Sequence, residues 1–314
     1  MAGIHYRADD TSDKKFTMET SMHNETRKTQ VIAVGNQKGG VGKTTNTLHL
    51  AAALGELGKK SLIIDLDGNC GATRGLGLGT DWLGSFEVLL GDQEPVDMIV
   101  TTDPAEGTEM PRNVELIPAR RNLEDFEAEY RKRNKFADPT GSLAPVIEKL
   151  RGRYEFIFLD TAPNASAPTV AAYRTAEWFI LSSEASKLSV DGLNDALTDI
   201  IAVRDAGNAK LRLLGVVLCK VMRNTRIAKT YLDRIGREFA AAGELGAFDT
   251  YIPRATGVEL AQEVGKTLFQ TDPEHKVTEA YRALAREVLA RLQTAEKVSV
   301  TIESKPEVKE ASNA

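Results

Sequence analysis

Short apolar runs alternate with longer segments of helical periodicity along most of the chain. Continuous apolar runs of this length predict strands that are buried on both faces, as in a parallel sheet. We expect strands at residues 31–35, 61–65, 114–117, 155–159, 178–182, 213–218 and 249–253. Because helical stretches separate them, the pattern predicts an α/β fold with a doubly wound, mostly parallel sheet flanked by helices.

Both ends of the chain are polar and lack a sustained period. Residues 1–30 and 294–314 contain too little apolar surface to offset the entropy lost on ordering. We therefore expect a mobile N-terminal arm at 1–30, one folded domain at 31–293 and a flexible tail at 294–314.

The net charge and the cysteine content indicate the compartment of the protein and the kinds of partner that it can bind. The formal net charge of -5 gives no global reason to expect nucleic acid or membrane, so a basic binding surface must be local. The two cysteines, Cys70 and Cys219, make no disulfide framework and favour a reducing compartment. The sequence contains neither an apolar run of about 18 residues nor a secretory segment. These features predict a cytoplasmic protein.

The strongest chemical signal is the glycine-rich loop NQKGGVGKTT at residues 36–45. It follows an expected strand and precedes a helix expected from Thr44 to about Gly58, which is the context of a phosphate-binding loop. Glycines let backbone N–H groups surround phosphate oxygens, and the helix N-terminus favours an anion. We expect the lysine of GKT to reach the β- and γ-phosphates and the following hydroxyl to face Mg²⁺. The expected nucleotide contacts in the loop are Gly39, Gly40, Val41, Gly42, Lys43, Thr44 and Thr45.

Three aspartates stand at the ends of expected strands. Asp65 and Asp67 end SLIIDLD, and Asp160 ends FIFLD. Carboxylates at the carboxyl edge of a parallel sheet face the ligand crevice, where they coordinate Mg²⁺ or orient an attacking water. Each alone is also consistent with a solvated turn or a helix N-cap. Beside a phosphate loop, the three together favour an Mg²⁺ site formed by Thr44, Asp65 and Asp160.

Together, KGGVGKTT, DLD and an apolar strand ending DTAP resemble the ParA-type partition ATPases, a deviant Walker family that also includes MinD-type proteins. The resemblance runs from about residue 31 to 292 and implies a P-loop ATPase domain that hydrolyses ATP with Mg²⁺. It implies that Lys38, the second lysine of the loop, crosses a dimer interface to the partner's nucleotide. Lys38, Lys43 and Asp67 would then be catalytic, with Asp67 orienting the hydrolytic water and Asp160 as the Walker B acid.

The sequence departs from the family after the second strand. Gly68, Asn69 and Cys70 replace the family's proline, glutamine and glycine, so we expect a looser switch segment. Met222 stands where guanine-binding relatives place an aspartate, and it cannot accept hydrogen bonds from guanine, which favours ATP. The resemblance also places Pro253 near the base.

A basic helix face is expected between about residues 224 and 239. Alone, this pattern favours an ordinary solvated face. The resemblance instead implies that an ATP-bound dimer binds DNA without sequence preference here and near residues 251–254, in a nucleoid-associated location. It further implies that a ParB-like centromere-binding partner stimulates hydrolysis. The expected DNA contacts are Arg223, Arg226, Lys229, Arg234, Arg254 and Lys266.

The alternative is a MinD-like positioning ATPase that acts on a membrane or a protein assembly. Such a protein would need a C-terminal amphipathic membrane helix. Residues 276–293 carry an apolar stripe that is typical of a core-packing helix, and the tail after it is acidic and poor in apolar residues. We therefore expect no membrane partner. The stripe consists of Val277, Ala280, Tyr281, Leu284, Val288 and Leu292.

Overall fold

The computed structural model describes residues 28–184, 198, 201–205, 207–222 and 245–303. The sheet begins at Gln30, one residue before the expected start of the domain. The last helix continues to Glu303, past the boundary expected at residue 293, because its helical pattern extends into the segment read as a tail.

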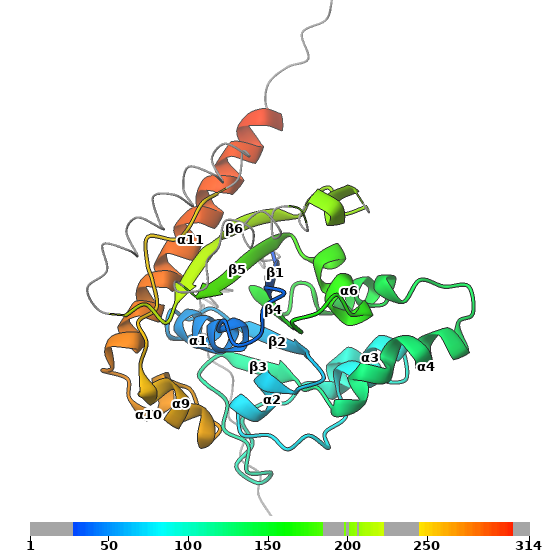
Figure 1. The fold of residues 1–314 in the computed structure, drawn as a ribbon, viewed down its shortest axis with the longest axis horizontal. Coiled ribbons are helices and arrows are strands. Elements are labelled where there is room, and N and C mark those ends of the chain that lie inside the picture. The colour runs from blue at the N-terminus through cyan, green and yellow to red at the C-terminus, as the bar shows by residue number, and fades with distance from the viewer. Residues whose placement is uncertain (1–27, 185–197, 199–200, 206, 223–244, 304–314) are drawn as a thin grey trace, which may run out of the picture.

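Six strands form one sheet in the order β3-β2-β4-β1-β5-β6, and every pairing between neighbours is parallel. The predicted α/β, doubly wound architecture is confirmed, and Figure 1 shows helices on both faces of this sheet. The strands are β1 (Gln30–Gly35), β2 (Ser61–Leu66), β3 (Val114–Ile117), β4 (Phe156–Thr161), β5 (Trp178–Glu184) and β6 (Arg212–Cys219).

The strand expected at residues 249–253 is wrong. This segment runs beside the end of β6, where the Ile252 N–H donates to the Leu218 carbonyl at 2.8 Å. It makes only an isolated bridge, between Val221 and Pro253. Proline has no N–H to donate, so it cannot continue a hydrogen-bonded ladder.

The helices lie in two layers, because alternate residues of each strand face opposite sides of the sheet. In β1, Val31 and Ala33 belong to one apolar cluster, with residues of α5 and α6, whereas Ile32 and Val34 pack with α1 and α11. Figure 1 shows α1 and α11 over one face and α3, α4 and α6 over the other. The α-helices are α1 (Lys43–Glu56), α2 (Gly71–Gly75), α3 (Ser85–Leu90), α4 (Phe126–Arg133), α5 (Leu143–Leu150), α6 (Ala167–Thr175), α9 (Thr256–Glu263), α10 (Leu268–Thr271) and α11 (Lys276–Glu303). Short 3-10 turns lie at Pro95–Met98, Arg121–Asp125 and Pro139–Gly141.

The apolar stripe of α11 packs in the core, as predicted. Val277, Tyr281, Leu284 and Val288 are fully buried in the cluster that also contains α1. This face of α11 is therefore covered by the protein's own side chains.

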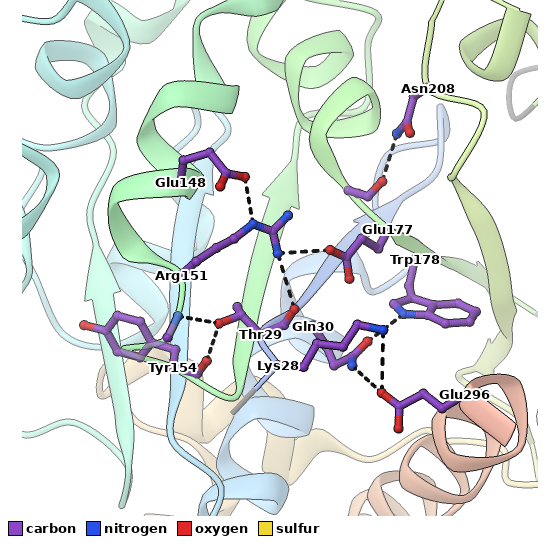
Figure 2. Close-up of polar contacts among 12 residues, drawn as sticks. Lys28, Thr29, Gln30, Glu148, Arg151, Tyr154, Glu177, Trp178, Asn208 and Glu296 are labelled. Carbon is purple, nitrogen blue, oxygen red and sulfur yellow. Dashed lines mark hydrogen bonds and ion pairs between the residues drawn. The ribbon is translucent and has the colours of Figure 1, made fainter. Parts of the chain in front are cut away.

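A closed polar network lies at the amino ends of the strands (Figure 2). Gln30, the first residue of β1, accepts a hydrogen bond from Trp178 Nε1 at 2.8 Å and donates one to Glu296 Oε1 at 3.1 Å. Arg151 forms an ion pair with Glu177, with 3.0 Å between Nη1 and Oε1. These side chains satisfy one another and join β1 and β5 to the helices around them.

Candidate active site

The loop between β1 and α1 has the backbone that its glycines allow. Gly40 has φ +72° and Gly42, the residue before α1, has φ +95°. Both values lie in the left-handed region, which strains residues that carry a β-carbon. The loop therefore needs glycine here to bring the N-terminus of α1 to the end of β1.

A cavity of about 670 Å³ opens at this loop. Its volume is within the usual range for small-molecule sites, roughly 300–1,000 Å³. Its walls come from the loop, from the segment 67–75 and from residues 252–262 with the end of β6. The structure brings together in this lining the predicted residues Gly39, Gly40, Gly42, Lys43, Thr44, Thr45, Asp67, Pro253 and Arg254.

Lys43 is the buried cation of the cavity. Only 7% of its surface is exposed, and Nζ donates to the Lys38 carbonyl at 3.3 Å. Burial lowers the pKa of Lys43, while the negative charges of Asp160 and Asp67 act in the opposite direction. A bound anion would stabilise this partly desolvated ammonium, so the geometry suits a phosphate group.

Behind Thr44 lies the buried carboxylate of Asp160. Asp160 Oδ2 accepts a hydrogen bond from Thr44 Oγ1 at 2.8 Å, and Oδ1 accepts one from Thr47 Oγ1 at 3.1 Å. Asp65 on β2 is its neighbour in the sheet register, and both carboxylates are fully buried. Burial, and then the charge of Asp65, raises the pKa of Asp160. A divalent cation beside Thr44 and Asp160 would offset this repulsion, so these residues fit Mg²⁺.

The Asp65 carboxylate, in contrast, is directed to α2. Oδ2 accepts hydrogen bonds from the Thr73 N–H at 2.9 Å and from Thr73 Oγ1 at 2.7 Å, and Oδ1 accepts one from the Asp67 N–H at 3.1 Å. Neither Asp65 nor Asp160 lines the cavity itself, but Asp160 is bonded to the lining residue Thr44, whereas Asp65 is not. The contacts of Asp65 indicate that it holds the start of α2 in place, and a direct bond to the metal stays a prediction.

Asp67 lines the cavity within a closely packed turn. Its Oδ1 accepts hydrogen bonds from the Asn69 N–H at 2.9 Å and from Asn69 Nδ2 at 3.1 Å. Cys70 is fully buried, and a β-carbon at Gly68 would lie 2.7 Å from Glu124 Cγ. The contacts of this segment are therefore tight, unlike the looser packing expected from its departures at residues 68–70.

Two predicted nucleotide contacts, Val41 and Met222, lie away from the cavity wall, as does Lys38, which was predicted to act on a partner's nucleotide. Lys38 is exposed and does not line the cavity, unlike Lys43. Val41 is buried in the protein, with 1% of its surface exposed. Met222 is 64% exposed and outside the lining, three residues beyond the end of β6 at Cys219.

The predicted DNA contacts fall into different surroundings. Arg254 is one of the residues that line the cavity. Lys266 forms an ion pair with Glu109, with 2.8 Å between Nζ and Oε2. Arg223, Arg226, Lys229 and Arg234 lie outside the described residues.

Sequence reasoning missed several cavity residues. Lys220 donates from Nζ to the Gly40 carbonyl at 2.7 Å, and Gln262 Nε2 donates to Thr45 Oγ1 at 3.2 Å. Arg74 also lines the cavity. The position of Lys220 two residues after the strand expected at 213–218 was the available signal. The positions of Arg74 and Gln262 in the cavity depend on tertiary packing.

Comparison with known proteins supports the same family. Residues 29–213 match the AAA_31 family, described as an AAA domain. The chain is 35% identical over 269 residues to the chromosome-partitioning ATPase Soj of Thermus thermophilus, covering 85% of this chain and 98% of that protein.

Two solved structures extend the comparison to the fold. Cobyrinic acid a,c-diamide synthase from Mycobacterium smegmatis, with bound ATP analog and magnesium, has a TM-score of 0.71 and 29% identity, covering 85% of this chain and 96% of that one. The septum site-determining protein MinD from Pyrococcus horikoshii, complexed with Mg-ADP, has a TM-score of 0.64 and 28% identity, covering 83% and 96%.

Among the described residues, no helix is both long enough and apolar enough to cross a membrane. The phosphate loop, the strand-end aspartates and the match over most of the chain to Soj lead to one assignment: the chain belongs to the ParA/Soj family of partition ATPases.

Proposed function

We propose that the chain binds ATP with Mg²⁺ in the cavity at the phosphate loop and hydrolyses it to drive the segregation of DNA. Lys43 would neutralise the outer phosphates, and Thr44 with Asp160 would hold the metal. The metal would supply charge stabilisation for phosphoryl transfer. This arrangement is supported by the buried ammonium in the cavity and by the Thr44–Asp160 hydrogen bond of 2.8 Å.

Asp67 would orient the attacking water. It lines the cavity and is 9% exposed, and its Oδ1 is bonded to the Asn69 backbone and side chain. A carboxylate fixed in this way is suited to holding a water in one orientation.

The observation that carries the proposal is the contrast between the two lysines of the loop. Lys43 is buried in the cavity, whereas Lys38 is exposed and outside its lining. Lys38 is therefore available to a second copy of the chain. We infer that ATP joins two copies face to face and that Lys38 of each reaches the nucleotide of the other.

The dimer would bind DNA without sequence preference, and a ParB-like partner would stimulate hydrolysis and release it, giving a nucleoid-associated cycle. Phosphate contacts from a few basic residues do not require a positive net charge. Arg223, Arg226, Lys229, Arg234, Arg254 and Lys266 remain the proposed contacts. Of the two that the structure describes, Arg254 is exposed, whereas Lys266 would have to exchange Glu109 for a DNA phosphate.

A MinD-like positioning ATPase is the second candidate, favoured by the similarity to the Pyrococcus horikoshii protein. A membrane role would need an apolar helix face that is free to enter lipid. The apolar face of α11 is buried against α1, which argues against that use of it.

One experiment separates the two candidates. The protein is mixed with Mg²⁺ and a slowly hydrolysed ATP analogue and tested for DNA binding by gel shift and for sedimentation with anionic liposomes. We expect a DNA shift with the analogue, none with ADP, and no sedimentation with liposomes. Lys43→Ala is the control in both arms. Nucleotide-dependent liposome binding without a DNA shift would overturn the partition role and favour the MinD-like one.

A further inference from the structure

Lys220, the first residue after β6, holds an unusual backbone conformation at the cavity wall. Its φ of +55° is in the left-handed region, which is unfavourable for a residue with a β-carbon. Both chain neighbours are anchored: Cys219 pairs with Glu184 of β5, and Val221 bridges to Pro253. These contacts on both sides hold Lys220 in a strained conformation, and residues of this kind are concentrated at functional sites.

The Lys220 side chain extends from β6 to the phosphate loop. Its Nζ donates a hydrogen bond to the Gly40 carbonyl oxygen at 2.7 Å. A β-carbon built at Gly39 or Gly40 would meet no atom within 4 Å, so side-chain packing does not hold this part of the loop. Its conformation must depend on polar contacts, of which the bond from Lys220 is one.

The hydrogen bond from Lys220 orients the N–H group that follows the Gly40 carbonyl as well as the carbonyl itself. A trans peptide unit is planar, and its C=O and N–H point in opposite directions. When Lys220 fixes the direction of the Gly40 carbonyl, it also fixes the Val41 N–H at the other side of that plane. Ordered N–H groups of this kind are what a phosphate chain requires from a glycine-rich loop.

We propose that Lys220 is a positioning residue that holds the phosphate loop in its anion-binding conformation before the nucleotide arrives. This role rests on the proposed placement of ATP in the cavity and is independent of DNA segregation. Because the contact is made to the loop itself, its loss weakens ATP and ADP binding by the same factor. Lys43, in contrast, acts on the outer phosphates directly.

The test uses three substitutions at residue 220. Lys220→Gly removes the ammonium and also relieves the left-handed strain, Lys220→Met keeps the aliphatic stem, and Lys220→Arg keeps a cationic donor. Affinities for Mg·ATP and Mg·ADP are measured by calorimetry, and the melting temperature is measured without nucleotide. Lys43→Ala serves as the control for the site itself.

We expect Lys220→Gly to melt at or above the wild-type temperature, yet to bind both nucleotides about tenfold more weakly, the scale of one hydrogen bond to a charged group. Lys220→Met should show the same loss and Lys220→Arg should recover most of it. Unchanged affinity in Lys220→Gly would make Lys220 a turn residue only. A loss confined to ATP would place it on the γ-phosphate, and tighter binding would make it an obstruction; each result overturns the proposal. If Lys43→Ala also binds normally, the placement of ATP in this cavity fails as well.

Discussion

The amino ends of the strands (the amino edge) and their carboxyl ends (the carboxyl edge) both carry polar side chains, but the charges are arranged in opposite ways. At the amino edge, Arg151 faces Glu177, and the side-chain amide of Gln30 is bonded at both of its ends (Figure 2). At the carboxyl edge, two aspartates of like charge, Asp65 and Asp160, are register neighbours in adjacent strands.

This difference distinguishes a structural network from a binding site. Paired opposite charges and satisfied amides stabilise the fold without any ligand. Burial raises the pKa of both carboxyl groups, and the charge of Asp65 raises that of Asp160 further, so the pair opposes folding unless a cation or hydrogen bonds compensate. The carboxyl edge adds a cavity and a partly desolvated lysine, and we infer that Mg²⁺ and a nucleotide supply the missing charges.

Replacing Lys43 should have the largest effect on nucleotide binding. We expect Lys43→Ala to weaken Mg·ATP binding by roughly a thousandfold or more, since a buried cation on two phosphates is lost. Isothermal titration with Mg·ATP measures this. An affinity equal to wild type would refute the assignment of the loop as the phosphate site.

Replacing Asp67 should slow ATP hydrolysis and leave ATP affinity unchanged. We expect Asp67→Ala to bind ATP normally and to hydrolyse it on the order of a hundredfold more slowly, because the water loses its orienting group. The ATP-bound dimer should then persist in size-exclusion chromatography. Hydrolysis at the wild-type rate would remove Asp67 from the mechanism.

A substitution at the amino edge should instead lower the stability of the fold and leave ATP binding unchanged. The buried Thr29 hydroxyl donates to the Tyr154 carbonyl at 2.8 Å and accepts from the Gly152 N–H at 2.9 Å. Thr29→Val should lower the free energy of unfolding by about 1–3 kcal/mol, since both backbone groups lose a partner. ATP affinity should stay within about twofold of wild type, a margin well below one hydrogen bond. Chemical denaturation and calorimetry measure the two quantities.

The matched control for Thr29→Val is a substitution of the preceding residue, Lys28, which is exposed. Lys28 is 3.8 Å from Glu296, and both side chains are largely exposed. Lys28→Ala should change the free energy of unfolding by less than about 0.5 kcal/mol, as for other exposed ion pairs. A larger loss here than in Thr29→Val would contradict the structural role assigned to the buried network.

Much of the carboxyl edge was predictable because its signals are local. Each signal lies within one short stretch of sequence: the apolar run and glycines around Gly35, and the aspartates that end two other strands. The structure brings these separate stretches to one edge. Likewise, the period of residues 276–293 was sufficient to predict the buried face of α11.

What the sequence could not provide depends on contacts between distant segments. Lys220 donates to the Gly40 carbonyl from a left-handed position that contacts with β5 and with Pro253 hold in place. Residues 249–253 have the composition of a strand, yet Pro253 interrupts the ladder. The orientation of Asp65 toward Thr73 rather than the cavity follows from the position of α2. Each of these outcomes is set by tertiary geometry.

The central claim is that Lys43 binds the nucleotide of its own subunit whereas Lys38 acts on the partner's nucleotide. One measurement tests this claim directly. Analytical ultracentrifugation of wild type, Lys38→Ala and Lys43→Ala with Mg²⁺ and a slowly hydrolysed ATP analogue reports the mass and the bound nucleotide together. We predict a nucleotide-bound dimer for wild type, a nucleotide-bound monomer for Lys38→Ala and a nucleotide-free monomer for Lys43→Ala. A Lys38→Ala protein that dimerises like wild type, or that loses nucleotide as Lys43→Ala does, would contradict the claim that Lys38 acts on the partner's nucleotide.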